Sequence, residues 1–529
     1  MKKRLNIKNI LLTAAGLMLL SIALTGCSQN TAAIVETDNS TLTESASDQG
    51  DTHRVIHLEG GDTGYPNPFR HTSRGPGIAK MQLLYDSLLE KDEKGLIPWL
   101  AKSWETSGDG TVYTFHLQNN AKWHDGKPLT AEDAAFTFSY YKDHPPVSND
   151  LLVDGEYIVT EAKALDDQTL QVTFSHFDLT FLEKAGSVRI LPKHIWSEVQ
   201  DPAAYDGDEA AVGSGPYRLE SYNPEQGAYR YQAFNDYWGF KPAAEAIEWI
   251  PVSDRVLAFE NREIDLINAS ADLLTRYDND KAYTLKSSPS YHSYRLMINM
   301  ETEPLLKDKN IRQAMAYGID RQELVEKVAR GAGTVSSMGY IPVYSQWYNP
   351  QIQQYNYNVN KAKELLGGHT YSFQLLTDNS QEGVKTAELI KLSLEKIGIT
   401  VTLQSAESKT RDHALKTGDY QLLLINSGGM GGDPDYIRTV YGSGSETIKG
   451  WSDETIEDLA ARQAVQTDES LRKDLLGQLQ ERIAEEVPII MLYGTTDNYV
   501  YRSNNYNGWM FRYDHSKCDH NKLSYLIRE

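Results

Sequence analysis

The second half of this chain alternates strand-like and helix-like segments, and this alternation constrains the fold more than any other feature. Apolar strand-like runs are expected at 371–377, 399–405 and 420–426, and helical patterns separate them at 382–397 and 407–417. Strands that alternate with helices of about 10–15 residues favour parallel βαβ units. The sequence therefore predicts an α/β domain in this half.

The first half has a different pattern of predicted secondary structure, with many short strands. Its helical patterns are expected at 77–90 and 131–142, and Thr130 and Asp133 have the spacing of a capping box. The expected strands are 55–58, 112–117, 157–163, 169–174, 216–222 and 228–234. Later segments are a strand at 292–299, helices at 308–318, 321–330, 360–366, 453–465 and 469–486, and a strand at 489–493. The change of texture near residue 288 predicts two lobes, which suits a chain of 529 residues.

The N-terminus has the pattern of a secretory signal. Basic residues at 2–4 and 8 precede an apolar run from Ile10 to Leu24. That run has about 15 residues, short of the ~20 that a spanning helix needs, which disfavours a transmembrane anchor. Leu24-Thr25-Gly26-Cys27 resembles a bacterial lipobox. The resemblance implies that residues 1–26 are a removed lipoprotein signal peptide and that Cys27 is acylated.

Residues 27–52 are rich in Ser, Thr, Asp and Ala and have almost no large apolar side chains. Such a composition cannot bury enough surface to become ordered, so we expect a disordered tether before a body that begins near His53.

Charge and cysteine content exclude several functions. Subtracting the four positive charges of residues 1–26 from the formal net charge of −21 gives −25 for the mature chain. A protein this acidic is a poor nucleic-acid binder, and charge does not hold it to anionic lipid. If Cys27 is acylated, Cys518 has no partner, so no intrachain disulfide is expected.

Motifs of catalysis are not found in the sequence. There is no phosphate loop, no HExxH and no GxSxG, and the run Gly428–Gly432 lacks the Lys and Ser/Thr of a nucleotide loop. The sequence therefore indicates neither an enzyme nor a cofactor. The 32 tyrosines and 9 tryptophans could line a ligand cleft, although ordinary packing explains most of them.

Several runs together resemble the family-5 extracellular solute-binding proteins of peptide/nickel-type ABC importers. The longest is DGTVYTFHLQNNAKWHDGKPLTAED at 109–133. The others are NPF at 67–69, LLYDSLL at 83–89 with KG at 94–95, PWLA at 98–101 with SWE at 103–105, GSGPY at 213–217, NREIDLI at 261–267 and IRQAMAYGID at 311–320. Their order and spacing hold from about 54 to 500, close to the whole mature body.

The resemblance implies an α/β, two-lobed periplasmic-binding-protein-like fold (type II, large) with an extra subdomain in lobe one. We expect lobe one at 53–288 with the inserted subdomain at about 90–205, lobe two at 289–495, and a C-terminal segment at 496–529 that returns to lobe one. The family engulfs a ligand between lobes by hinge closure. The resemblance also implies a monomer on the extracytoplasmic face of the membrane, or in the periplasm, that delivers its ligand to permease and ATPase subunits.

The Gly-rich loop after the strand at 420–426 is the first candidate site, because ligands in open α/β sheets bind at strand ends. It reads SGGMGGDPDY. Peptide-binding family members carry an Asp four residues before the proline, where it pairs with the peptide's α-amine, and here that residue is Met430. Asp433, Asp435 and Tyr436 remain candidates, although Asp433-Pro434 also fits an N-cap followed by an N1 proline.

Four further places could contact a ligand. The loop after the first strand holds Tyr65, Arg70, His71 and Arg74, where an arginine could bind a carboxylate and His71 a metal. The alternative is that these side chains are ordinary polar groups of a solvent-exposed loop.

The crossover strand carries His292, Tyr294 and Arg295, with interlobe packing as the alternative. Arg189 falls near the carboxylate-binding Arg of nickel-type relatives, within about two residues of register. Trp347 could line the cleft or fill the core.

Two ligand hypotheses follow. One is a short peptide, favoured by the near full-length resemblance. The other is nickel or another metal held by a small chelator, favoured by Met430 and by His71 and His292 beside the expected cleft. A surface hydrolase or adhesin with the same fold is a third interpretation, which the lack of a catalytic motif disfavours.

Overall fold

The computed structural model describes residues 54–528, except residues 74, 154, 279, 429 and 514. The predicted signal peptide at 1–26, Cys27, the predicted tether and Arg74 therefore lie outside the described residues. In the described part, none of the helices has the length and apolar character that crossing a membrane would require.

Two hydrophobic cores divide the described residues into two lobes. The first core contains side chains from Ile56 to Leu266 and, from the other end of the chain, from Tyr499 to Tyr525. The second contains side chains from Tyr294 to Tyr493. Each core is continuous within its own lobe, so each lobe has its own hydrophobic interior.

Lobe one is built on a four-stranded sheet with the order β1-β12-β11-β10. Its strands are β1 (Val55–Glu59), β10 (Tyr217–Asn223), β11 (Ala228–Ala233) and β12 (Ala246–Ile250). β1 runs parallel to β12, and the other two pairs are antiparallel. Helix α1 (Gly75–Gln82) follows the loop after β1.

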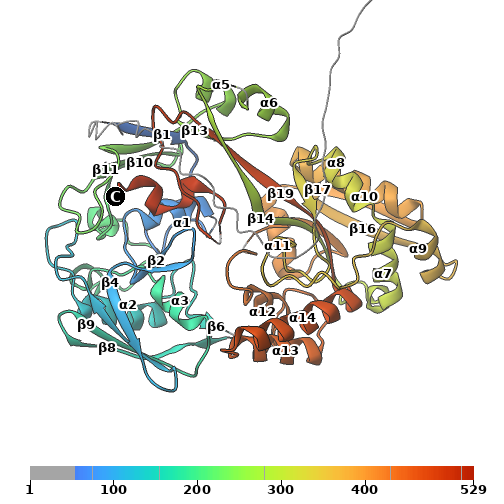
Figure 1. Cartoon of the computed structure of the whole chain (residues 1–529), viewed down its shortest axis with the longest axis horizontal. Coiled ribbons are helices and arrows are strands. Elements are labelled where there is room, and N and C mark those ends of the chain that lie inside the picture. Colours follow the sequence, from blue (N-terminus) through green and yellow to red (C-terminus); the bar gives the residue numbers. More distant parts are fainter. Residues whose placement is uncertain are drawn as a thin grey trace, which may run out of the picture. The chain divides into compact units, whose positions relative to one another are not determined.

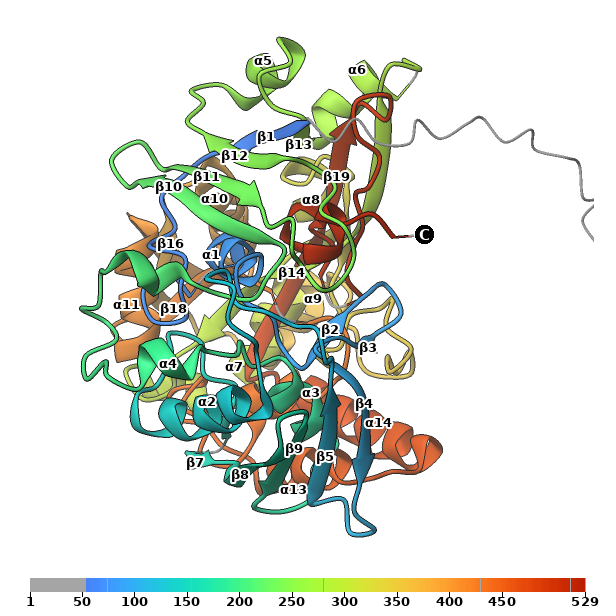
Figure 2. The same cartoon turned by 90° about the vertical axis from the view of Figure 1, so that its left-hand side faces the viewer.

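A second, antiparallel sheet lies within the segment 90–205 that the sequence predicts as an inserted subdomain. Its order is β4-β5-β9-β8, and α2 (Ala131–Asp143) packs against β8 and β9 (Figure 2). The strands are β4 (Ala101–Thr106), β5 (Val112–Leu117), β8 (Val159–Asp166) and β9 (Thr169–Phe174). Around them lie β2 (Leu89–Lys91), β3 (Leu96–Pro98), β6 (Leu152–Val153), β7 (Glu156–Tyr157), α3 (Phe181–Gly186), α4 (Lys193–Trp196) and η1 (Asp208–Ala211).

A seven-stranded sheet with the order β13-β19-β14-β18-β16-β17 extends from lobe two into lobe one, whose core contains Leu266 of β13 and Tyr499 of β19, and β15 pairs with β19. Its strands are β13 (Leu266–Asn268), β14 (Thr284–Ile298), β15 (Gly333–Val335), β16 (Tyr371–Asp378), β17 (Ile399–Ala406), β18 (Leu422–Ser427) and β19 (Ile489–Tyr501). β16 runs parallel to both β17 and β18, which confirms the predicted βαβ units. β14 and β19 are antiparallel to their neighbours, so the sheet is mixed.

Helices surround this sheet in lobe two (Figure 1). They are α7 (Lys309–Gly318), α8 (Arg321–Lys327), α9 (Val359–Leu365), α10 (Gln381–Glu395), α11 (Ser408–Thr417), α12 (Tyr436–Tyr441), α13 (Glu454–Ala464) and α14 (Glu469–Glu486). The short elements α5 (Arg255–Glu260), η2 (Ala271–Leu273), α6 (Leu274–Tyr277) and η3 (Pro304–Lys307) lie between β12 and α7 in the chain.

The strands β14 and β19 form the connection between the lobes (Figure 1). One end of the pair meets β13, and the other meets β18. Their register is irregular between Pro289 and Ser293, and such an irregularity bends a strand pair locally. The predicted lobe boundaries at 288/289 and 495/496 fall inside these two strands and stay predictions.

Residues after β19 lie against lobe one. The backbone N–H of Ala243 donates to the carbonyl of Tyr525 at 2.9 Å, and Pro242 forms a bridge with Leu526. The turns η4 (Cys518–His520) and η5 (Lys522–Tyr525) belong to this segment. Cys518 is a buried free thiol, and burial raises its pKa well above the ordinary value.

Three predicted element boundaries are wrong by eight residues. The strand predicted at 292–299 begins earlier, as β14 at Thr284, because β19 also pairs with its first part. The helix predicted at 77–90 ends at Gln82, because the residues after it are buried on all sides and bond to neighbouring segments rather than to a helix. Leu84, for example, accepts a hydrogen bond from the N–H of Gly215 at 2.8 Å. The strand predicted at 489–493 continues as β19 to Tyr501, because β14 and β13 pair with its second half.

Candidate ligand-binding cleft

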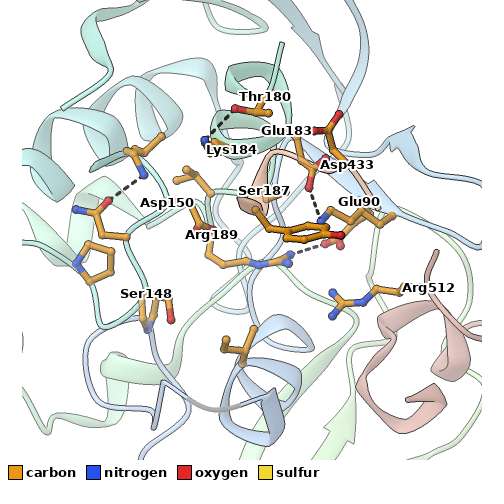
Figure 3. Close-up of a pocket in the computed structure, with 18 of the residues that line it drawn as sticks. Glu90, Ser148, Asp150, Thr180, Glu183, Lys184, Ser187, Arg189, Asp433 and Arg512 are labelled. Atoms are coloured by element: carbon orange, nitrogen blue, oxygen red, sulfur yellow. Dashed lines mark hydrogen bonds and ion pairs between the residues drawn. The ribbon is translucent and has the colours of Figure 1, made fainter. Parts of the chain in front are cut away.

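The cleft cavity has a volume of about 410 Å³ and is lined by both lobes. Lobe one contributes α1, residues 146–151 and residues 180–189, and lobe two contributes residues 431–439. Arg512 and Tyr513, from the segment after β19, complete the wall (Figure 3). Its volume falls within the range of about 300–1,000 Å³ that is usual for small-molecule sites.

Arg189 and Glu90 form a buried ion pair in the lobe-one wall (Figure 3). Arg189 also donates to Ser87 Oγ at 2.9 Å, and Lys522 Nζ lies 2.8 Å from Glu90 Oε1. Burial alone would raise the pKa of Glu90, but the charges of Arg189 and Lys522 outweigh it and lower the pKa to about 2. Glu90 is therefore ionised throughout the physiological range.

Lys522 connects this wall to a polar centre around Asp86 behind it. Lys522 Nζ lies 2.8 Å from Asp86 Oδ1. Asp86 also accepts hydrogen bonds from Trp99 Nε1 at 2.9 Å, Trp238 Nε1 at 3.0 Å, Tyr237 Oη at 3.1 Å and Ser214 Oγ at 3.2 Å. A carboxylate with this many donors holds its neighbours in one arrangement, so the Arg189–Glu90 wall is rigid.

A second ion pair faces the cavity. Lys91 Nζ lies 2.6 Å from Glu183 Oε1, and the hydroxyl of Tyr513 donates to Glu183 Oε2 at 2.9 Å. The lining therefore presents positive and negative groups side by side.

The loop after β18 forms the lobe-two wall. Asp433 accepts two hydrogen bonds from Arg472, both 2.7 Å long, and Asp435 Oδ1 accepts one from Gln463 Nε2 at 2.7 Å. The predicted N-cap role of Asp433 is wrong, because α12 begins at Tyr436 and its N-cap is Asp435. Asp433 instead closes a turn by accepting from the N–H of Asp435 at 2.9 Å.

Polar contacts join the two lobes beside the cavity. Arg438 Nη2, on α12, lies 2.7 Å from Asp178 Oδ2 of lobe one. Lys184 Nζ lies 3.6 Å from Asp435 Oδ2, and the N–H of Leu179 donates to the carbonyl of Ala464 at 2.9 Å. The structure thus has the lobes in contact along one edge of the cleft.

Arg295 is a buried cation in the central strand β14. Its side chain is 5% exposed, and its guanidinium lies 5.2 Å from the ring centroid of Tyr340. Its Nε has no hydrogen-bond partner among the described residues. Burial lowers the pKa of Arg295 to about 10, which leaves the group charged at neutral pH.

Tyr294 and Trp347 have partners inside lobe two. Tyr294 stacks on Tyr493 at 4.8 Å and donates to Glu382 at 3.2 Å. The guanidinium of Arg472 lies 5.2 Å above the ring of Trp347, which places Trp347 behind the Arg472–Asp433 pair. Neither residue lines the cleft cavity.

His292 and Met430 line a different and much smaller cavity, of about 20 Å³. His292 Nδ1 lies 3.1 Å from Ser290 Oγ, and burial lowers the pKa of His292. A Cβ on Gly428 would come within 2.7 Å of His292 Nε2, so the Gly-rich loop passes close to this ring.

The loop after β1 places its candidates in two environments. His71 lines the cleft, and burial lowers its pKa, which favours the neutral imidazole. Its Nδ1 lies 2.6 Å from the carbonyl oxygen of Thr72, which can only accept, so Nε2 keeps a lone pair. Arg70 instead donates to the carbonyl of Tyr205 at 2.9 Å and lies 5.1 Å from the ring of Tyr65.

Five residues proposed from the sequence thus line the cleft cavity. They are His71, Arg189, Asp433, Asp435 and Tyr436. Sequence reasoning missed Ser148, Asp150, Glu183, Lys184 and Arg512, among others. The turn-rich run HPPVSND at 144–150 was the available signal for the first two. Among the described residues, no group of three or more His, Cys, Asp or Glu side chains is placed to hold a metal.

The sequence is similar to a family of known proteins. The family model of the bacterial extracellular solute-binding proteins, family 5 Middle, matches residues 95–448. The chain is 28% identical over 495 residues to the dipeptide-binding protein of Escherichia coli K12, which covers 86% of this chain and 91% of that protein. It is 25% identical over 438 residues to the nickel-binding periplasmic protein of the same organism, covering 76% and 82%.

A solved structure has the same fold. The ABC transporter substrate-binding protein CtaP of Listeria monocytogenes aligns with a TM-score of 0.76 at 23% identity. The alignment covers 90% of this chain and 99% of that one. The predicted two-lobed α/β fold is therefore confirmed.

Proposed function

This chain belongs to family 5 of the bacterial extracellular solute-binding proteins, and on that premise we propose that it captures a short peptide for an ABC importer. In this proposal the protein is a lipid-anchored monomer on the extracytoplasmic face of the membrane. It binds and releases its ligand without chemical change and hands it to the permease and ATPase subunits. The lipobox-like Leu24–Cys27 supports the anchor.

The observation that carries the peptide proposal is the mixed charge of the cleft cavity. Lys91, Lys184, Arg189 and Arg512 line it together with Glu90, Asp150, Glu183, Asp433 and Asp435. A peptide with free termini carries one charge of each sign, so a lining that presents both signs is electrostatically complementary to it. A dipeptide-binding relative at 28% identity agrees with this.

The carboxylate and the amine of the peptide can each be assigned to a residue of one lobe. Arg295 does not line the cleft cavity, but it is a buried cation with no carboxylate oxygen within 4.0 Å among the described residues. We assign the ligand carboxylate to it, reached as the tyrosines over it adjust. For the amine, Met430 cannot act as an ion-pair partner. Asp150 is exposed and has no ion pair within 4.0 Å among the described residues, which makes it the assigned amine partner.

The second candidate ligand is a metal chelate, with nickel as the metal. His71 supports it, because its neutral ring faces the cleft with Nε2 able to coordinate. A nickel-binding relative at 25% identity also supports it. His71 and His292 line separate cavities, so the two histidines proposed from the sequence would not share one ion.

Native mass spectrometry of the purified mature protein tests the proposal, because a co-purified ligand is weighed directly. Calorimetry on ligand-stripped protein follows, with dipeptides, the same dipeptides acetylated at the N-terminus or amidated at the C-terminus, and a nickel–histidine complex. We expect heat from free dipeptides and about a tenfold or greater loss when either terminus is blocked. Heat from nickel–histidine alone would overturn the peptide proposal in favour of the chelate.

A further inference from the structure

A second cavity, of about 360 Å³, lies on the other side of α1 from the cleft cavity. Ile78 and Met81 of α1 line the cleft, whereas Ala79 and Lys80 line this second cavity, and the two cavities share no lining residue. The rest of its wall comes from the end of β1 and the loop after it, from β13, from residues 517–520, and from Trp249, Arg255 and Tyr499.

Lys80 is a buried cation that has no counter-ion in this wall among the described residues. Its side chain is only 4% exposed, and its Nζ lies 4.8 Å from the ring centroid of Tyr229 and 5.3 Å from that of Trp249. No carboxylate oxygen of the described residues lies within 4.0 Å of Nζ. Two aromatic faces stabilise an ammonium, but they leave its charge uncompensated.

The acids that line the cavity already have donors. Asp62 accepts from Tyr222 Oη at 2.7 Å and from the N–H of Gly64 at 3.0 Å. Asp519 accepts from Tyr499 Oη at 3.3 Å. Glu59 is 4.0 Å from Arg255, which also lines the cavity. Burial lowers the pKa of Lys80 to about 8 against the opposing pull of Asp519 and Asp62, so most of the lysine is charged at neutral pH.

We propose that this cavity binds a small organic carboxylate, whose carboxylate group pairs with the ammonium of Lys80. The apolar side chains of Leu58, Leu266 and Ile267 line the same space and suit the hydrocarbon part of the ligand. An inorganic anion would leave that apolar surface without a partner. The site is distinct from the cleft, and the inference does not depend on what the cleft binds.

Calorimetry with benzoate, hexanoate and inorganic phosphate tests the site. We expect benzoate or hexanoate to bind the full mature protein and phosphate to bind at least about tenfold more weakly. Lys80→Met keeps the length and apolar stem of the side chain and should weaken carboxylate binding by about tenfold or more. Tight phosphate binding without carboxylate binding, or no binding of any probe, would overturn the proposal.

Two control variants separate this site from others. Lys396 also lies over a tyrosine ring, 5.7 Å from Tyr357, but in lobe two, so Lys396→Met should leave carboxylate affinity unchanged. Arg189→Ala alters the cleft and should also leave it unchanged. Loss of benzoate binding in Arg189→Ala with retention in Lys80→Met would place the carboxylate in the cleft and refute the second site.

A measurement on the wild-type protein covers the case in which Lys80→Met does not fold. Reductive methylation with ¹³C-formaldehyde labels lysines, and NMR then follows the pKa of each one. A bound carboxylate favours the charged ammonium, so saturating benzoate should raise the pKa of Lys80 above its value of about 8. An unchanged pKa at a benzoate concentration that produces heat would refute the contact with Lys80.

Discussion

At the residue scale, Glu90 is a buried carboxylate held between two cations, and its contribution to the stability of the folded protein decreases as the pH falls. Its pKa falls from the usual 4.5 to about 2 in the folded protein. A depressed pKa contributes stability that is present above 4.5 and lost as the pH falls toward 2, on the order of 3 kcal/mol at neutral pH.

Glu90→Gln should therefore lower the free energy of unfolding at pH 7 by about 3 kcal/mol, because Arg189 and Lys522 lose their shared counter-charge. The difference from wild type should shrink as the pH falls from 4.5 to about 2. Urea unfolding across that range measures it. Glu105→Gln is the control, since that side chain is 80% exposed, and an equal loss in both variants would contradict the argument.

Arg295 behaves oppositely, because it is buried without a carboxylate partner. Arg295→Met removes an uncompensated charge from the interior of lobe two, so the melting temperature should stay nearly the same or rise. If its guanidinium holds the ligand carboxylate, affinity should fall by about tenfold to a hundredfold, as for loss of a charged hydrogen bond. Calorimetry and thermal unfolding measure the two effects.

The control for that variant is Arg462→Met, whose side chain is 58% exposed on α13 and paired with Asp458. It should alter neither quantity. A large loss of stability with intact affinity in Arg295→Met would identify Arg295 as a structural residue.

Sequence reasoning found part of the cleft wall but not its charge partners. Arg189 was proposed because it falls near the carboxylate-binding Arg of the resembled family. Asp433 was proposed because its loop follows a strand. Both signals are local in the sequence. Glu90 and Lys522 are 432 residues apart in the chain, and nothing local in either segment indicates that they meet. For the same reason, the sequence did not predict that Arg472 would form an ion pair with Asp433.

At the element scale, strands with strict alternation were predicted to within a residue, and fully buried segments were not. The strands β5 and β9 bury every second side chain, so their period of two is readable at 112–117 and 169–174. The helix expected at 77–90 failed because Leu83 to Leu89 are buried on every side, and such a run fits a helical period by chance.

The contact between α12 and the lobe-one loop at 178–180 should favour the closed arrangement of the lobes. Asp178→Asn removes the charge that faces Arg438 at 2.7 Å, while the remaining carbonyl can still accept from the N–H of Thr180. We expect a larger radius of gyration without ligand and a several-fold loss of ligand affinity, because the closed state becomes less populated. Small-angle scattering and calorimetry measure these changes.

Arg482→Gln provides the matched control, since it breaks an ion pair of similar length, 2.8 Å to Asp453, within lobe two. It should leave the radius of gyration unchanged. An identical radius for wild type and Asp178→Asn would show that this contact does not influence closure.

At the scale of the whole molecule, membrane attachment and ligand binding should be separable. Residues 1–53, including Cys27, are outside the described part, and both cores begin after them. Cys27→Ala should move the protein from the membrane fraction to the soluble extracytoplasmic fraction with unchanged ligand affinity. Fractionation and calorimetry test this, with Cys518→Ala as the variant that should stay attached. Retention of Cys27→Ala in the membrane fraction would refute acylation at that residue.

The return of the chain to lobe one after β19 affects the order in which a new molecule can become functional. Lys522 neutralises Asp86 and Glu90 inside lobe one, and Arg512 and Tyr513 complete the cleft wall. A chain leaving the ribosome or the export channel makes residues 54–268 of lobe one hundreds of residues before the segment that follows β19. Until residues 512–525 emerge, Asp86 lacks the ammonium of Lys522, and Glu90 has only Arg189 as its counter-charge. The nascent chain should therefore stay open to chaperones and proteases, and it should gain ligand affinity in one late step.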